Sequence, residues 1–81
     1  MTNKQKAKIM ICALESDYFE YGTRVLIKGE NCFEVVSMFE EGFETTREDL
    51  AQKYDTLDKG TQRELKGLYR QEKREKGGKR G

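Results

Sequence analysis

Two neighbouring segments of the chain carry mostly apolar side chains at every second position, and this pattern constrains the fold more than any other feature. Successive side chains of a strand point to opposite faces of a sheet. The pattern therefore predicts the two antiparallel strands of a β-hairpin between residues 21 and 39. The face that these strands share carries Tyr21, Thr23, Val25, Ile27, Phe33, Val35, Ser37 and Phe39.

The loop between the two strands determines their register. A three-residue loop at residues 29–31 keeps the alternating residues on one shared face, whereas a two-residue loop would set odd positions against even ones. The pairs that this register predicts are Ile27 with Phe33, Val25 with Val35, and Tyr21 with Phe39.

The segment before the hairpin predicts a helix from Asn3 to Ser16, with Thr2 or Asn3 as its cap. Its apolar residues recur at i, i+3, i+4 and i+7, the spacing of one helix face, and these are Ala7, Met10, Ile11 and Leu14. The unbroken apolar run within residues 7–14 is also compatible with a buried strand. Helix and strand therefore both remain open for these eight residues.

After the hairpin we expect a short third strand from Phe43 to Thr45 and then two helices. Each helix start has a threonine three residues before a glutamate, the spacing of a capping box. These pairs are Thr45 with Glu48 and Thr61 with Glu64. The first of the two helices is expected to end near Gly60, and no apolar residue follows Tyr69.

Together these segments predict one α+β domain with an N-terminal helix, a three-stranded antiparallel meander and two C-terminal helices. Eighty-one residues accommodate a single domain of this kind. We place the domain at residues 1–76 and a disordered basic tail at residues 77–81.

The order of the first five predicted elements is the same as in double-stranded-RNA-binding domains. In that family a lysine cluster at the start of the second helix contacts phosphates. Here the corresponding positions are Arg47, Glu48 and Asp49, which would repel phosphate. The resemblance is limited to element order and does not predict membership of the family.

Composition indicates a cytoplasmic protein without a membrane span. The longest apolar run, from Ile9 to Leu14, is too short to cross a bilayer or to form the core of a signal peptide. We expect Cys12 and Cys32 to be thiols packed as small apolar side chains, with a disulfide as the alternative.

The chain also lacks the residues on which most catalytic sites depend. It has no histidine, which excludes an ordinary catalytic triad and, with only two cysteines, a four-ligand zinc site. It has no glycine-rich phosphate loop either. We therefore expect no catalytic residue, no metal site and no cofactor.

Charge is distributed unevenly along the sequence. Residues 1–12 carry a net charge of +3, residues 13–50 of −7 and residues 51–81 of +5, which together give the overall +1. An asymmetry of this kind bears on partners and solubility and not on the fold. It indicates two candidate surfaces, an acidic one in the middle segment and a basic one in the last helix.

The acidic middle segment predicts a small non-enzymatic regulatory or inhibitor protein, of the accessory type found in phages and mobile elements. A negative surface around the sheet would bind a protein partner with a basic surface, in the limit by mimicking nucleic acid. A solvated face without a partner is the alternative. The expected contacts are Glu30, Glu34, Glu40, Glu41, Glu44 and Glu48, with Phe43 as an apolar anchor.

The last helix predicts a different function, nucleic-acid binding. Five of its basic residues fall within about 100° on a helical wheel, opposite its apolar residues. Such an arrangement would contact phosphates without regard to base sequence. The predicted contacts are Arg63, Lys66, Arg70, Lys73, Arg74, Lys79 and Arg80.

The second strand carries apolar residues on both of its faces. Cys32, Val36 and Met38 lie on the face opposite Phe33 and Val35. We expect a helix to cover each side of the sheet. If no helix does so, Leu26, Val36 and Met38 form an exposed patch that a homodimer or another partner would cover.

Overall fold

The computed structural model describes residues 1–38 and 41–78, the last five of these as helix backbone only. The elements follow the predicted α+β order. They are α1 (Asn3–Glu15), β1 (Arg24–Gly29), β2 (Cys32–Val36), β3 (Phe43–Thr45), α2 (Arg47–Thr56) and α3 (Lys59–Gly78).

The sheet is antiparallel, with the strand order β1-β2-β3, and most of the predicted register is confirmed. Ile27 lies opposite Phe33 and Val25 opposite Val35. A bulge between Ile27 and Gly29 pairs Gly29 with Cys32, so that two residues, not three, form the tip of the hairpin. Pairing of β1 begins at Arg24, which leaves Tyr21 in the preceding turn, and Phe39 lies outside the described residues.

The first helix begins with a complete capping box, which explains why residues 7–14 form a helix and not a strand. The Thr2 hydroxyl accepts a hydrogen bond from the Gln5 N–H at 3.1 Å, and the Thr2 N–H donates to the Gln5 side chain at 2.9 Å. Two of the otherwise unpaired groups of the first turn are thereby satisfied.

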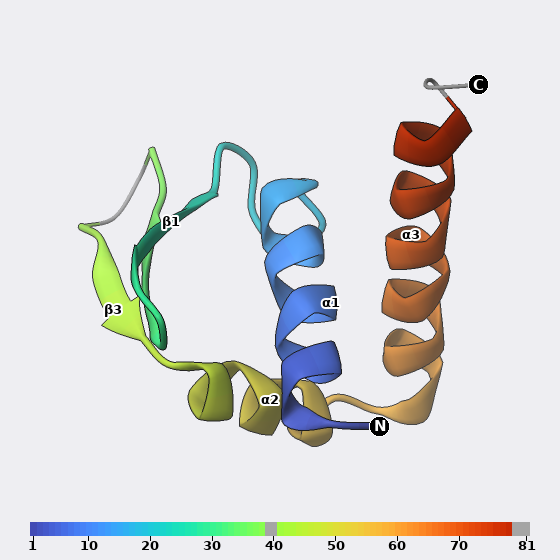
Figure 1. Ribbon diagram of the computed structural model, residues 1–81, viewed down its shortest axis with the longest axis horizontal. Coiled ribbons are helices and arrows are strands. Elements are labelled where there is room, and N and C mark those ends of the chain that lie inside the picture. Colours follow the sequence, from blue (N-terminus) through green and yellow to red (C-terminus); the bar gives the residue numbers. More distant parts are fainter. Residues whose placement is uncertain (39–40, 79–81) are drawn as a thin grey trace.

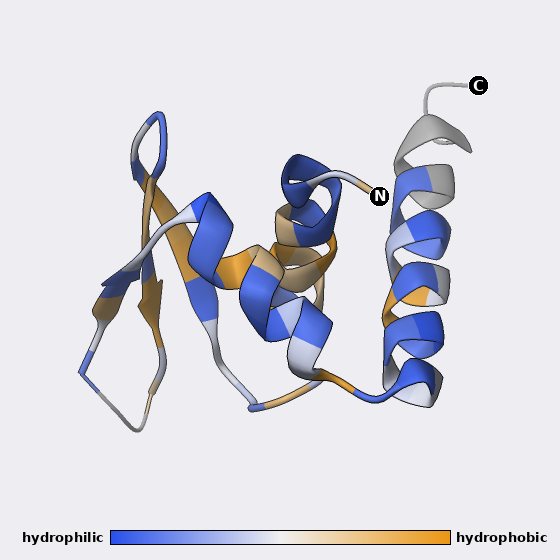
Figure 2. Cartoon of the chain, turned by 90° about the horizontal axis from the view of Figure 1, so that it is seen from below, coloured by the Kyte–Doolittle hydropathy of each residue, from blue (hydrophilic) through white to orange (hydrophobic). Residues whose placement is uncertain are grey.

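The elements are arranged in layers, with α1 in the middle (Figure 1). The sheet lies on one side of α1 and α3 on the other, while α2 crosses below. Figure 2 shows the same order from a perpendicular direction and shows that α3 is hydrophilic along most of its length. None of the described helices is both long and apolar enough to cross a membrane.

Because α1 is covered on two sides, its buried surface is wider than the single predicted stripe. Ala7, Ile9, Met10 and Ala13 are buried, whereas Ile11 and Leu14 are only partly so. A helix that is apolar around most of its circumference is expected at such a position. The unbroken run from Ile9 to Leu14 is therefore explained by the layer arrangement.

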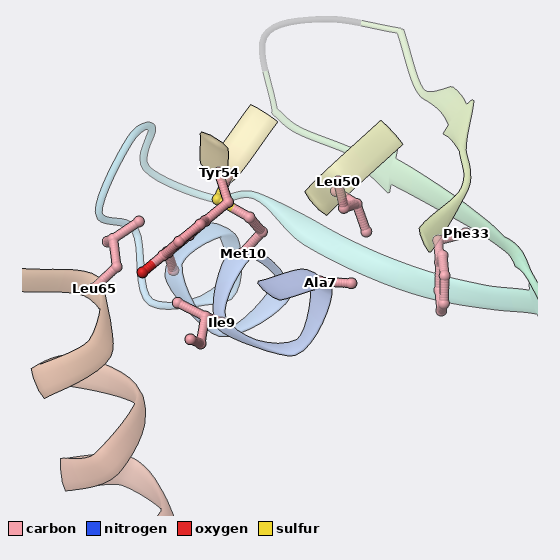
Figure 3. Packing of buried hydrophobic residues seen from close by; sticks show 8 residues of the cluster. Ala7, Ile9, Met10, Phe33, Leu50, Tyr54 and Leu65 are labelled. Carbon is pink, nitrogen blue, oxygen red and sulfur yellow. The ribbon is translucent and has the colours of Figure 1, made fainter. Parts of the chain in front are cut away.

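The core lies between α1 and its neighbours (Figure 3). Leu50 of α2 lies near Ala7 and Phe33, and Tyr54 lies beside Leu65 of α3. Leu50 and Leu65 are each 1% exposed. The sheet, α1 and α2 thus form one continuous cluster, to which Leu65 attaches α3.

Both C-terminal helices begin at residues other than the predicted ones. The cap of α2 is Thr46, whose hydroxyl accepts a hydrogen bond from the Asp49 N–H at 3.2 Å. Thr45 instead completes β3 opposite Phe33 and is buried. The pairing of strands therefore determines which of the two adjacent threonines caps the helix.

The start of α3 was also predicted too late. The helix begins at Lys59, so Gly60 lies in its first turn and not at the end of α2. Asp58 accepts a hydrogen bond from the Thr61 N–H at 3.2 Å and one from the Thr61 hydroxyl at 2.6 Å. At its other end α3 continues through Gly78, two residues past the predicted domain limit at residue 76, and residues 79–81 lie outside the described residues.

Asp58 provides a test of this cap. The hydroxyl of Thr61, followed by the Thr61 N–H, lowers the pKa of the Asp58 carboxyl below its usual value. A carboxyl with a lowered pKa in the folded state stabilises that state above the unfolded pKa, and the stabilisation is lost as the pH falls through the folded pKa.

We therefore expect Thr61→Ala to raise the pKa of Asp58 toward its usual value. Thr61→Ser, which keeps the hydroxyl, is expected to leave it low. An NMR titration of the side-chain carboxyl measures both. Equal pKa values in the two variants would contradict the assigned hydrogen bond.

Candidate functional site

One face of the sheet is not covered by any helix within residues 1–38 and 41–78, because the described helices all lie on the other side (Figures 1 and 2). This finding overturns the expectation that a helix covers each side. We call the uncovered side the outer sheet face. The side chains that the register places on it are Arg24, Leu26, Lys28, Cys32, Glu34, Val36 and Glu44.

Apolar side chains of the outer sheet face flank Glu34 of the central strand. Leu26 is 46% exposed and lies opposite Glu34, and the partly exposed Val36 and Cys32 are its diagonal neighbours on β2. Met38, two residues beyond β2, is 69% exposed, and its side chain lies against Gly22. A Cβ atom at Gly22 would stand 2.7 Å from the Met38 sulfur, and the φ angle of Gly22 is +82°. Glycine is therefore required at position 22, where the Met38 side chain lies against the backbone.

Two carboxylates stand opposite each other on this face. Glu34 of β2 pairs with Glu44 of β3 in the register, and Lys28 of β1 reaches Glu34 with an Nζ–Oε1 distance of 3.5 Å. Like charges directly across a strand pair destabilise a sheet. The single ion pair offsets this repulsion only in part. Stability of the sheet alone does not account for the Glu34–Glu44 pair.

The hairpin tip holds a second acidic group, which has a structural role. The Asn31 side chain donates to the Glu48 carboxylate at 2.8 Å and accepts from the Arg47 N–H at 2.7 Å. The bond from Asn31 is the main reason that the pKa of Glu48 is lowered. Glu48 thus joins the hairpin to α2. The Arg47 guanidinium donates to the Glu30 carbonyl at 3.4 Å, which brings a positive charge beside these acids.

The structure does not gather the predicted acidic contacts on one surface. Glu34 and Glu44 lie on the outer sheet face, and Glu30 and Glu48 lie at the hairpin tip. Glu41 and Phe43 line a shallow hollow beside Val35 on a third side, and Phe43 is 49% exposed there. Glu40 lies outside the described residues.

Exposed apolar side chains, by contrast, are concentrated around the sheet. With the exception of Met1, the large apolar residues that stand out of the described surface come from the strands and the loops beside them. They are Tyr18, Phe19, Tyr21, Leu26, Ile27, Met38 and Phe43. The rings of Tyr18 and Phe19 pack edge to face at 5.0 Å between centroids. These exposed residues do not share one face, because Ile27 lies on the side of β1 opposite Leu26, and Phe43 lies at the hollow beside Val35.

A groove between α1 and α3 brings together the basic residues. It has a volume of about 420 Å³, and we call it the α1–α3 groove. Lys66, Arg70 and Lys73, three of the predicted nucleic-acid contacts, line it from α3, and Lys8 lines it from α1. Lys8 was not among the predicted contacts, although the positive charge of residues 1–12 was an available signal. Arg63 is exposed on α3 but does not line the groove, and the side chains of Arg74, Lys79 and Arg80 lie outside the described residues.

The acidic residues of α3 that the structure describes bond to the rest of the protein. The Glu72 carboxylate accepts a hydrogen bond from the Cys12 thiol at 2.7 Å and one from the Ser16 hydroxyl at 3.0 Å. Glu64 accepts a bond from the Tyr18 hydroxyl at 2.7 Å, and this bond is the main cause of the raised pKa of Tyr18. These contacts attach α3 to α1 and to the loop that follows it.

Neither cysteine forms a disulfide within the described part of the chain, as expected. The same residues hold no group of three histidine, cysteine, aspartate or glutamate side chains that could bind a metal ion. Comparison of the chain with protein-family models, with curated proteins and with solved structures finds no match. The outer sheet face and the α1–α3 groove are therefore the two candidate binding sites of the described structure.

Proposed function

We propose that this chain is a small non-enzymatic regulatory or inhibitory protein that binds a protein partner through the outer sheet face. The observation that carries the proposal is the position of the described helices on one side of a sheet that is apolar on both sides. The uncovered apolar side chains lose contact with water when a partner covers them, which favours association.

The distribution of residues on the outer sheet face agrees with a protein interface. Leu26 lies opposite Glu34 of the central strand and Val36 lies opposite Arg24, so apolar and charged side chains stand side by side on this face. Such a surface suits a partner that offers both apolar contacts and a basic group. A partner that places a basic side chain between the two glutamates would relieve their repulsion. Arginine fits this position best because its planar guanidinium can bond two carboxylates.

The division of the acidic residues over three places determines the kind of contact. Imitation of a nucleic-acid backbone needs a continuous row of negative charge. The Glu34–Glu44 pair on the outer sheet face is instead a local group beside an apolar patch. The proposed partner therefore has an apolar surface with a basic residue at its edge.

Two neighbouring residues of β1 provide a matched test. Leu26 is 46% exposed on the outer sheet face, and Ile27 is 78% exposed on the other side of the same strand. We expect Leu26→Ser to abolish capture of the partner from a nuclease-treated lysate of the source cells, and Ile27→Ser to retain it. Mass spectrometry of the captured proteins is the measurement, and thermal unfolding of each variant serves as the control for folding.

Glu44→Gln adds a second signature. The substitution removes the repulsion with Glu34, so we expect a slightly more stable protein that binds its partner more weakly. Identical capture by the wild type, Leu26→Ser and Glu44→Gln would overturn the proposal. Equal loss in Leu26→Ser and Ile27→Ser would assign binding to the edge of β1 instead.

Sedimentation equilibrium distinguishes another protein from a second copy of this chain. On this proposal we expect the isolated chain to be monomeric. A dimer that Leu26→Ser dissociates would show that the face pairs with itself and would overturn the proposal of a different partner.

A further inference from the structure

We infer that the α1–α3 groove binds the phosphate backbone of a single-stranded nucleic acid. This site is separate from the outer sheet face, because α1 stands between the sheet and α3 (Figure 1).

The groove is lined by basic side chains from both of its walls. Lys8 comes from α1, and Lys66, Arg70 and Lys73 come from α3. No acidic residue among those described lines this stretch; Glu15 and Glu72 line the adjoining stretch toward the C-terminal end of α1. None of the four bases forms an ion pair with a described residue. Four cations facing one hollow repel one another, and an anionic ligand would relieve that repulsion.

The described acids of the same helix form no ion pair with these bases, although Glu72 lines the adjoining hollow together with Lys8 and Lys73. The Glu64 carboxylate bonds to Tyr18, and the Glu72 carboxylate bonds to Cys12 and Ser16. The described acids of α3 therefore hold the helix in place, while its bases face the groove and the solvent. A helix face that served only solubility would not require this separation.

The spacing of the bases suits an extended polyanion. Lys66, Arg70 and Lys73 stand at i, i+4 and i+7 on one side of α3. Seven residues of helix span about 10 Å, so the three charges form a row that runs along the groove. Such a row follows a backbone of repeated phosphates and is longer than a single phosphate group requires.

The groove also offers surfaces for bases. Tyr69 lines it between Lys66 and Arg70 in the sequence, and Ile9 and Met1 line it from the N-terminal side. Sites for single strands combine a positive groove with an aromatic side chain on which a base stacks. The bases of a duplex are stacked and paired within it, whereas those of a single strand are free to stack on Tyr69. A single strand is therefore the ligand that uses both features of the groove.

Fluorescence anisotropy of a labelled oligothymidylate or oligouridylate with the full chain at low salt tests this inference. We expect binding that Lys8→Glu and Arg70→Glu each weaken about tenfold, since each replaces a phosphate contact by a repulsion. Lys53→Glu is the matched control, because it makes the same change of charge at an exposed position of α2 outside the groove. It is expected to leave the affinity within about twofold. Circular dichroism confirms that each variant is folded.

The dependence on salt gives a readout that a general loss of stability would not produce. Neutralising one phosphate contact with Lys8→Gln is expected to reduce the slope of log affinity against log salt by about 0.7, the value for one contact with a single strand. The Gln variant of Lys53 is expected to leave the slope unchanged.

Four results would overturn the inference. They are the absence of binding at low salt, equal weakening by Lys53→Glu and the groove variants, tighter binding of a duplex of the same sequence, and equally tight binding of polyglutamate. The last would show that the groove accepts any polyanion. Each of these results leaves the proposal for the outer sheet face unaffected, because the substitutions lie on the other side of the sheet.

Discussion

Replacing Leu50 with alanine is expected to lower the free energy of unfolding by about 2–5 kcal/mol, the usual cost of truncating a fully buried leucine. Leu50 is 1% exposed and belongs to the same buried cluster as Ala7 of α1 and Phe33 of β2 (Figure 3). Truncation removes contacts with both layers at once and leaves a cavity where they meet. Since a small domain has a total stability of roughly 5–15 kcal/mol, the loss is a large fraction of it.

Urea denaturation followed by circular dichroism measures this loss. Gln52→Ala serves as the control, because Gln52 is exposed on the same helix and alanine is a strong helix former. It is expected to change the free energy of unfolding by less than about 0.5 kcal/mol. A cost of under about 1 kcal/mol for Leu50→Ala would mean that α2 does not pack against α1 as described.

The features that the sequence predicted correctly depend on neighbouring residues. The period of two in the hairpin specified the pairing of Ile27 with Phe33, because only that register keeps both on the face toward the helices. The Thr2 cap of α1 likewise depends on the residue three positions later. Both are short-range relations that a sequence pattern contains.

The helix starts were displaced because tertiary contacts chose between adjacent candidates. Thr45 and Thr46 both suit an N-cap by residue type. The ladder with Phe33 takes Thr45 into β3, so the cap moves to Thr46. At α3, Asp58 is the better acceptor, and Thr61 becomes a donor to it. The spacing of threonine and glutamate contains no information about either choice.

The location of the candidate sites was the least predictable feature, because it depends on how the layers stack. Both faces of β2 carry apolar residues, so the strand alone does not indicate whether helices cover one face or both. Lys8 lies far from Arg70 in the sequence, yet the two line one groove because α1 and α3 lie side by side. Glu34 and Glu48, closer in sequence, lie in different places because one is on a strand face and the other bonds to the hairpin tip.

Replacing Leu65 with alanine is expected to release α3 before the rest of the protein unfolds. Leu65 is 1% exposed, whereas Leu68 and Tyr69 of the same helix are only half-buried. Because α3 packs mainly against α1, the truncation is expected to weaken that one interface by about 2–5 kcal/mol. An element attached by few buried contacts opens locally at a lower free energy than the whole domain.

Native-state hydrogen exchange measures this effect, with Gly67→Ala as the matched control. In Leu65→Ala we expect the amides of α3 to lose protection while those of β2 keep theirs. We also expect the α1–α3 groove to bind oligonucleotide more weakly, although its charged residues are unchanged.

The control substitution is expected to stabilise α3. A Cβ atom at Gly67 would meet no other atom within 4 Å, and alanine is favoured over glycine in a helix by roughly 0.5–1 kcal/mol. Gly67→Ala is therefore expected to increase the protection of α3 and to restore part of it in the double variant. An equal loss of protection in α3 and β2 would show instead that α3 and the sheet unfold as one cooperative unit, so that the groove could not open while the outer sheet face stayed folded.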